Sequence, residues 1–416
     1  MSTTESLNTG THGIAHARHK QRIPLAARAF LRALEHLRHG HLVVHTPDGR
    51  HLSFGQAGVD GTVAAHLAIA DWRACGKILS GGDIGFAEAL REGWVDSADL
   101  TALLRLAIDN EQAVAKLVHS SGVAGLIHRI RHLLNRNSKA GSKRNIHAHY
   151  DLGNDFYRLW LDETMSYSSA WFDGRREQSM ADAQYAKMRR ALAQCRLPKD
   201  ARVLEIGCGW GALAQCAAQD FGAQVTGVTL SREQLAYGQQ RVQHQGLADR
   251  VELRYQDYRD IADGPFDAIV SIEMFEAVGR AYWPSYFATL RRQLAPGGRA
   301  CVQSITIRDE LFDRYVAGTD FIQQYIFPGG LMPSRAAFRA EAAKAGLVVE
   351  EEFAFGPDYA ETLRRWRHDF LHRDAQVRGL GFDTRFMRTW EFYLAYCEAA
   401  FDTGNTDVVQ FTLRHG

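Results

Sequence analysis

The stretch Val203–Gly211 has the pattern of a loop that binds a ligand. It reads VLEIGCGWG, an apolar run followed by glycines at alternate positions, Gly207, Gly209 and Gly211. Because glycine has no Cβ, a ligand could lie directly against this backbone at the carboxyl end of a strand. Glu205 adds a carboxylate just before the glycines. The spacing differs from the G-x-G-x-x-G loop of dinucleotide folds, where a helix N-terminus takes a pyrophosphate.

The acid and the glycine spacing resemble motif I of class I S-adenosylmethionine (SAM) methyltransferases, in which the acid lies near the amino-acid end of the cofactor. Residues 266–271 (FDAIVS) resemble the fourth strand of that fold, and 294–299 (LAPGGR) the turn before its fifth. Asp257 stands where these enzymes often place groups around the adenine. The apolar run 225–228 ends in Thr229, however, where most of them have an acid that holds the ribose.

A set of further motifs narrows the resemblance to one family. The chain resembles the cyclopropane fatty acid synthases and their mycolic acid relatives over about residues 145–416. The N-terminal part resembles, more loosely, the small extra domain of the bacterial phospholipid enzymes. The motifs follow in a fixed order: HYDLGNDFY at 149–157, MSYSSA at 165–170, GVTLSREQ at 227–234, QDYRD at 256–260, MFEAVG at 274–279, YIFPGG at 325–330 and FGPDY at 355–359.

This resemblance implies a cytoplasmic enzyme, peripheral to the inner leaflet, that acts on unsaturated phospholipid acyl chains. It transfers a methyl(ene) group from SAM to the cis double bond, and the resulting carbocation loses a proton as a cyclopropane ring closes. An alkene is a poor nucleophile, so positioning in a dry pocket must supply much of the acceleration. The aromatic residues that could line such a pocket are Tyr167, Trp171, Phe275, Tyr325, Phe327 and Tyr359.

The resemblance also assigns the cofactor site by position. Thr229 and Gln234 can hydrogen-bond the ribose or the methionyl part without an acid, which is consistent with the missing carboxylate. The cofactor-binding residues that carry over are Tyr167, Ser168, Glu205, Gly207, Gly209, Gly211, Thr229, Leu230, Gln234, Asp257, Tyr258 and Arg259.

A bicarbonate ion serves as the base in this family, held by a cysteine, a glutamate, a histidine, an isoleucine backbone and a tyrosine. Those positions, the catalytic candidates of this chain, read Ser169, Glu276, Gln303, Ile305 and Tyr359. Serine and glutamine still donate hydrogen bonds in place of cysteine and histidine. Glutamine cannot carry the positive charge of a histidine, so bicarbonate should be held less well.

Several alternatives stay open at this point. The cation could instead be quenched by hydride or lose its proton elsewhere, which gives a methyl-branched or methylene chain with Glu276 or ordered water as base. Glu276 could also be a structural carboxylate. The enzyme could also C-methylate another unsaturated lipid or a small natural product. A final alternative is that the protein binds SAM and associates with lipid but has no catalytic activity.

The elements that must position these residues can be predicted from the pattern of the whole chain. A length of 416 residues favours two domains. We expect a mobile tail at 1–23, a small N-terminal α+β domain at 24–135 that docks on lipid, and the methyltransferase domain at 145–416. A hairpin is expected at 41–54 around Pro47-Asp48-Gly49, and a break at Ser80–Asp83 before further helix. After Pro198, apolar runs alternate with helical windows, which predicts an α/β fold with a doubly wound, mainly parallel sheet.

The formal charge of +1 conceals an asymmetry that bears on partners. Residues 1–150 carry 18 Lys and Arg against 12 Asp and Glu, and 112–150 hold seven cations and no acid. Within that stretch, 126–134 has the apolar period of a basic amphipathic helix. It is either a packed connector or a contact with an anionic lipid surface, and no nucleic-acid partner is expected.

Composition excludes several other classes of protein. Hydrophobic residues at 46% and charged residues at 23% are ordinary globular values, so a disordered or disulfide-framework chain is not expected. No apolar window reaches membrane-spanning length. The six cysteines lack paired spacing and the HxH pairs lack further ligands, so reduced thiols and no metal are expected. The helical C-terminal region could cover the pocket or form a homodimer.

Overall fold

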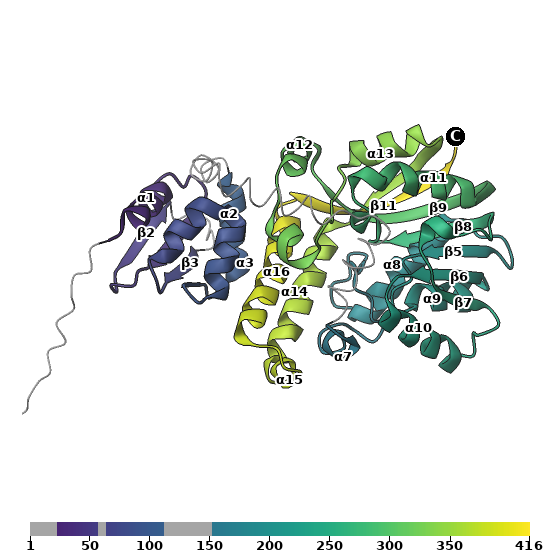
Figure 1. The fold of residues 1–416 in the computed structure, drawn as a ribbon, viewed down its shortest axis with the longest axis horizontal. Helices are drawn as coiled ribbons and strands as arrows, with labels where there is room; N and C mark the ends of the chain where they lie inside the picture. The colour runs from purple at the N-terminus through teal and green to yellow at the C-terminus, as the bar shows by residue number, and fades with distance from the viewer. Residues whose placement is uncertain (1–22, 57–63, 112–151) are drawn as a thin grey trace, which may run out of the picture.

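The computed structural model describes residues 23–56, 64–111 and 152–416, which form two units side by side (Figure 1). The smaller unit contains the N-terminal elements, coloured purple to blue, and the larger contains the rest. The expected basic helix at 126–134, the boundary at 135–145 and all but the last residue of the expected tail lie outside the described residues.

The N-terminal unit is a four-stranded sheet with helices packed on it. Its strand order is β2-β1-β3-β4, and β1 pairs antiparallel with β2 as the hairpin pattern predicts. The expected break at Ser80–Asp83 is confirmed, because Gly82 has non-helical backbone angles, φ 58° and ψ −130°, and kinks α2 into two helical parts. The elements are α1 (Leu25–Leu34), β1 (His41–His45), β2 (His51–Gly55), β3 (Ala64–Ile69), α2 (Arg73–Arg91), β4 (Val95–Asp96) and α3 (Leu100–Asp109).

A seven-stranded sheet of order β10-β11-β9-β8-β5-β6-β7 forms the centre of the larger unit. Strands β9, β8, β5, β6 and β7 are parallel, and β11 runs antiparallel between β9 and β10. The predicted doubly wound, mainly parallel sheet is therefore confirmed. The strands are β5 (Arg202–Ile206), β6 (Gln224–Thr229), β7 (Val251–Tyr255), β8 (Phe266–Ile272), β9 (Leu294–Ile307), β10 (Leu347–Ala354) and β11 (Thr406–His415).

Helices cover both faces of this sheet, and α14 and α16 stand between it and the N-terminal unit (Figure 1). Parallel strands need such cover because both of their faces are apolar. The helices are α7 (Asn154–Tyr157), α8 (Met180–Gln194), α9 (Ala212–Phe221), α10 (Arg232–His244), α11 (Trp283–Gln293), α12 (Asp309–Ala317), α13 (Arg335–Lys344), α14 (Gly356–His372), α15 (Asp374–Gly379) and α16 (Thr384–Asp402).

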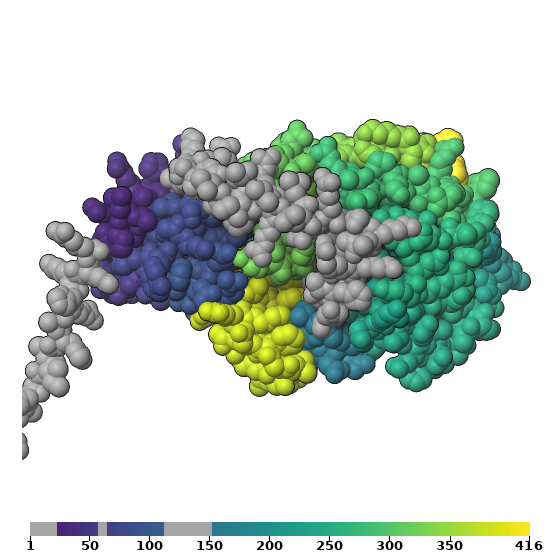
Figure 2. Space-filling view, viewed as in Figure 1, coloured from purple at the N-terminus to yellow at the C-terminus, as the bar shows by residue number. Residues whose placement is uncertain are grey.

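The N-terminal unit docks on α16 and on the segment that follows α12, and Figure 2 shows the two surfaces in contact. The Asp83 carboxylate accepts hydrogen bonds from the Phe321 amide, at 3.0 Å, and from the Tyr396 hydroxyl, at 3.1 Å. The Thr101 hydroxyl donates to the buried Glu398 carboxylate at 3.1 Å. These polar contacts fix the N-terminal unit against a helix that also borders a cavity described below.

Three general features of the described residues bear on the chemistry of the protein. All six cysteines lie within the described residues, and none forms a disulfide. Across 23–56, 64–111 and 152–416, no helix has the length and apolar content needed to cross a bilayer. In the same residues, no three or more His, Cys, Asp or Glu side chains are grouped so that they could hold a metal ion.

Candidate active site

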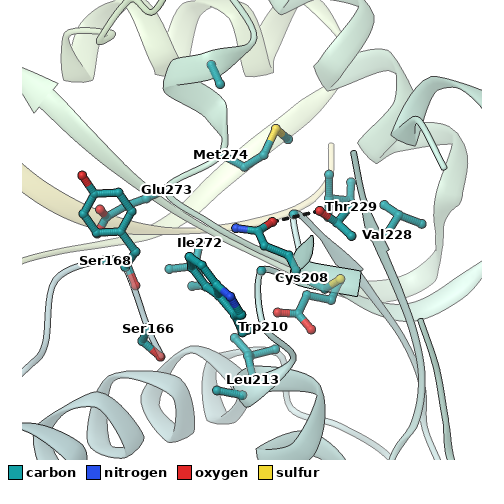
Figure 3. A pocket seen from close by; sticks show the side chains of 18 of the residues that line it. Ser166, Ser168, Cys208, Trp210, Leu213, Val228, Thr229, Ile272, Glu273 and Met274 are labelled. Atoms are coloured by element: carbon teal, nitrogen blue, oxygen red, sulfur yellow. Dashed lines mark hydrogen bonds between the residues drawn. The ribbon is translucent and has the colours of Figure 1, made fainter. Parts of the chain in front are cut away.

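A pocket opens where β5, β6 and β8 end, and the alternate-glycine loop forms one of its walls (Figure 3). Gly207, Gly209 and Gly211 all have positive φ, at 86°, 48° and 83°. A Cβ on Gly207 would lie 2.8 Å from the Met274 side chain, whereas a Cβ on Gly209 would meet no protein atom within 4 Å. The space over Gly209 is thus open to a ligand lying on the backbone.

Most of the predicted cofactor residues line this pocket. Gly211 and Asp257 do not line it, and both act on residues or elements beside it. Gly211 is the N-cap of α9 and packs against Gly238, because a Cβ there would lie 3.3 Å from the Gly238 Cα. Asp257 accepts hydrogen bonds at 2.8 and 2.6 Å from the Arg259 guanidinium and so orients that side chain. Those that do line the pocket are Tyr167, Ser168, Glu205, Gly207, Gly209, Thr229, Leu230, Gln234, Tyr258 and Arg259.

The polar groups of the pocket fit the amino-acid and sugar ends of SAM. The Glu205 side chain is buried, and its Oε2 has no hydrogen-bond partner among the described residues. Burial raises the pKa of this carboxyl well above its ordinary value, although the nearby Lys187 opposes that shift. The Thr229 hydroxyl donates to Gln234 Oε1 at 3.0 Å, a bond drawn in Figure 3, so both side chains are fixed where a ribose could bind. An ammonium group would supply the donor that Glu205 lacks.

A second, mostly apolar cavity adjoins the first and extends along α14 and α16. Tyr167, Glu273 and Ala277 line both cavities, so the two meet at these residues. Its other lining includes Phe327, Tyr359, Leu363, Tyr393, Phe401 and Leu331. An elongated apolar space that ends beside the cofactor pocket can hold a hydrocarbon chain with one segment exposed to the cofactor.

Three of the six aromatic residues predicted to line the acyl pocket do not reach it. Phe275 is buried in the core beneath the sheet, where its ring stacks on Trp283 at 5.3 Å. Trp171 packs edge-on against Phe353. Tyr325 points to the N-terminal unit, where its hydroxyl donates to Glu88. Motif position did not predict where these side chains point, because the direction of each depends on contacts with residues distant in sequence.

Glu273, which the sequence analysis missed, lies at the junction of the two cavities. One carboxylate oxygen accepts from the Ser169 amide at 2.9 Å and from Gln303 Nε2 at 2.7 Å. The other accepts from the Tyr359 hydroxyl at 2.6 Å. Desolvation raises the pKa of Glu273, while the Lys187 cation and these three donors counteract the rise. The available signal was a second acid three residues before Glu276, just after a buried strand.

Glu276 lies beside Glu273 but has different partners. Its Oε1 accepts hydrogen bonds from the Ile305 amide and from the Ser304 hydroxyl. Its Oε2 is buried and has no partner among the described residues. Desolvation, together with the Glu273 charge, raises the pKa of Glu276 to about 8. At neutral pH, Glu276 is therefore mostly protonated.

We expect Glu276→Gln to have a small effect on activity and a pH-dependent effect on stability. Because glutamine resembles the neutral acid, turnover at pH 7 should change by less than about threefold, which is under 1 kcal/mol. Because the pKa of Glu276 is higher in the folded than in the unfolded protein, the free energy of unfolding falls as pH rises from about 4.5 to about 8. The fall is up to about 1.4 kcal/mol per pH unit. Urea unfolding at pH 5 and 8.5 should show this loss in the wild type and a smaller one in the variant. Equal slopes would contradict the assignment.

The strand order, the glycine loop and the carboxylate facing it define a class I SAM-dependent methyltransferase, whose cofactor is SAM. Residues 137–411 match the profile of the mycolic acid cyclopropane synthetase family, and the chain belongs to that family. It is 41% identical to the tuberculostearic acid methyltransferase UfaA1 of Mycobacterium tuberculosis over 80% of this chain and 79% of that protein. It is 33% identical to the cyclopropane-fatty-acyl-phospholipid synthase of Escherichia coli, over 88% of this chain and 92% of that protein.

A solved structure in the same family has a similar fold. It is the mycolic acid cyclopropane synthase CmaA1 complexed with SAH and CTAB, 32% identical, with a TM-score of 0.61 over 65% of this chain and 97% of that chain. The relatives include both cyclopropane synthases and fatty acid methyltransferases. The protein is accordingly a SAM-dependent enzyme of lipid modification.

Proposed function

We propose that the enzyme transfers a methyl(ene) group from SAM to the cis double bond of unsaturated phospholipid acyl chains and forms cyclopropane fatty acids. The observation that carries this proposal is the junction at Tyr167, Glu273 and Ala277, where the cofactor pocket meets the apolar cavity. A double bond lying at that junction would face the cofactor, and the rest of the chain would occupy the apolar cavity.

The residues around the junction suit a reaction that passes through a carbocation. SAM supplies an electrophilic methyl group when bound. The Tyr167 hydroxyl lies 2.7 Å from that of Tyr393, and Phe327 packs near both rings, so π faces surround the reacting segment. Such faces stabilise positive charge, and the apolar walls exclude water that would quench it.

Mass spectrometry of lipids tests the proposal directly. Purified protein is incubated with methyl-labelled SAM and vesicles of cis-unsaturated phospholipid, and in parallel with the free fatty acid. The expected product is a labelled phospholipid chain that has gained one CH2 and no longer reacts as an alkene. Label in the free fatty acid alone would contradict the phospholipid substrate, and an absence of label in both would contradict the function.

A second candidate product is a methylene or methyl-branched chain. The 41% identity to a tuberculostearic acid methyltransferase favours it. A methylene chain needs the same proton loss as a ring, whereas a saturated branch also needs a hydride donor. The same incubation, repeated with and without reduced nicotinamide, therefore separates the products: a labelled chain that still reacts as an alkene is methylene, and a saturated, ring-free chain is methyl-branched.

The N-terminal unit, together with the basic stretch 112–150, is proposed to hold the enzyme on the cytoplasmic surface of the membrane. The support is the charge of that stretch, which carries seven cations and no acid. Flotation should recover the protein with vesicles that contain anionic lipid, less of it at high salt, and little with neutral vesicles. Equal binding to neutral vesicles would contradict an electrostatic contact.

A further inference from the structure

The hydrogen-bonding groups that the family resemblance assigned to bicarbonate already have partners within this chain. The Ser169 amide, the Gln303 amide group and the Tyr359 hydroxyl all donate to the Glu273 carboxylate. The Ile305 amide donates to Glu276. The Ser169 hydroxyl donates to the Ala170 carbonyl instead of facing the site. With its donors used, this set does not fit a separate anion.

We propose that Glu273 is the base of this enzyme, a built-in carboxylate that makes the reaction independent of bicarbonate. This inference rests on the proposed function, because it names the group that accepts the proton in that reaction. A carboxylate tethered by the chain replaces a diffusible anion and is present at full occupancy. It lines both cavities, so it touches the place where the methylated chain would lie.

The backbone at Glu273 supports a functional reason for this residue. Its φ is 48°, a left-handed conformation that L side chains other than asparagine and aspartate rarely adopt. The Glu273 amide donates to the Gln303 carbonyl at 2.8 Å, which fixes the residue at the end of β8. Such strain costs about 1 kcal/mol or more and persists where the position of the side chain is required.

A chain of hydrogen bonds orients the amide of Gln303 towards Glu273. Gln410 on β11 lies opposite Gln303 on β9, and its Nε2 donates to Gln303 Oε1 at 3.0 Å. Arg190 donates to Gln410 Oε1 at 2.8 Å, which fixes the orientation of that amide in turn. Gln303 must therefore present its NH2 group, a donor, to Glu273. This arrangement holds a carboxylate and would not hold a neutral acid equally well.

The proton transfer balances without any further reactant. The π electrons of the double bond form a new bond to the methyl carbon as the carbon–sulfur bond breaks, which leaves a lipid carbocation. Glu273 takes one proton from the added methyl group, and the C–H electron pair closes the third bond of the ring. The resulting carboxylic acid then returns its proton to solvent. Loss of the same proton after a hydride shift within the chain would give a methylene product with the same base.

Exchange of Glu273 for glycine or glutamine, with added anions, tests this inference. Glycine suits the positive φ and opens room for an anion, whereas glutamine keeps the volume without the charge. Both variants should lose at least about 100-fold in turnover. Bicarbonate or formate should restore the Glu273→Gly variant at least about tenfold and leave Glu273→Gln inactive. Wild-type turnover should be the same in carbonate-free buffer as in buffer that contains bicarbonate.

Asp173→Gly is the matched control, because Asp173 is an exposed residue with a φ of 51° that lines neither cavity. It relieves the same kind of backbone strain and should leave turnover and its anion response unchanged. A wild-type enzyme that requires bicarbonate, or a Glu273→Gln variant with more than half of the wild-type rate, would overturn the inference.

A binding measurement keeps the inference testable without any turnover. The ¹³C resonance of labelled bicarbonate should broaden with the Glu273→Gly variant and stay sharp with the wild type. Specific binding by the wild type would overturn the built-in base. If the wild type methylates no lipid, the proposed function fails, and this titration still decides whether Glu273 occupies the anion site.

Discussion

Replacement of Gly209 by valine should weaken SAM binding by at least about 100-fold, or about 3 kcal/mol. A Cβ at this position would meet no protein atom within 4 Å, so the added side chain would fill the space of the cofactor itself. The φ of 48° adds backbone strain for a β-branched residue. Isothermal titration with SAM measures the loss, and turnover should fall with it.

Gly222→Val separates cofactor loss from backbone strain. Gly222 is the C-cap of α9 with a φ of 64°, and a Cβ there also meets no atom within 4 Å. It does not line the cofactor pocket. This variant should lose stability and keep its affinity for SAM. If both variants lost affinity equally, the open space over Gly209 would not be the cofactor site.

Patterns that are local in sequence predicted the fold well. The loop at Val203–Gly211 and the strands around it follow from apolar runs of four to seven residues between helical windows, because burial on both faces leaves a continuous apolar stretch. Strand β10 escaped notice because it reads LVVEEEFA at the edge of the sheet, where three glutamates are tolerated. The break at Ser80–Asp83 follows from its paired glycines, and Gly82 does leave helical geometry there.

The site could be predicted only as far as its motifs extend. The pocket at the ends of β5, β6 and β8 is lined by several short stretches, and the family motifs coincide with most of these stretches. The partners of Glu273 come from three places, Ser169, Gln303 and Tyr359, separated from it by 104, 30 and 86 positions. Their meeting is a property of the folded sheet and α14. Sequence alone therefore suggested a diffusible anion where the chain provides its own carboxylate.

Lys187→Met should produce an enzyme that is more stable and less active. Lys187 is 1% exposed on α8, and its Nζ donates to the Ser168 hydroxyl at 2.6 Å. Desolvation lowers the pKa of Lys187 to about 8, despite the attraction of Glu273, Asp162 and Glu205. Burying this cation thus costs about 3 kcal/mol at pH 7, and methionine removes that cost. Urea unfolding should show a gain of up to this size.

The Lys187→Met substitution should change the pH dependence of both stability and kcat. Because the pKa of Lys187 is lower in the folded than in the unfolded protein, the wild type should become more stable as pH rises from about 8 to about 10.4. The variant should lack this gain. Loss of the cation also raises the pKa of Glu273, so the acid limb of kcat should move to higher pH. A shift of one unit reduces turnover about tenfold on that limb.

Lys344→Met provides the matched control, because Lys344 is an exposed lysine paired with Glu341 at the end of α13. Its stability and its kcat profile should match those of the wild type, since an exposed ion pair contributes little. A destabilised Lys187→Met variant with an unchanged acid limb would mean that Lys187 acts through packing alone. The combination of higher stability with a shifted acid limb would instead show that the buried cation keeps Glu273 ionised at the expense of the fold.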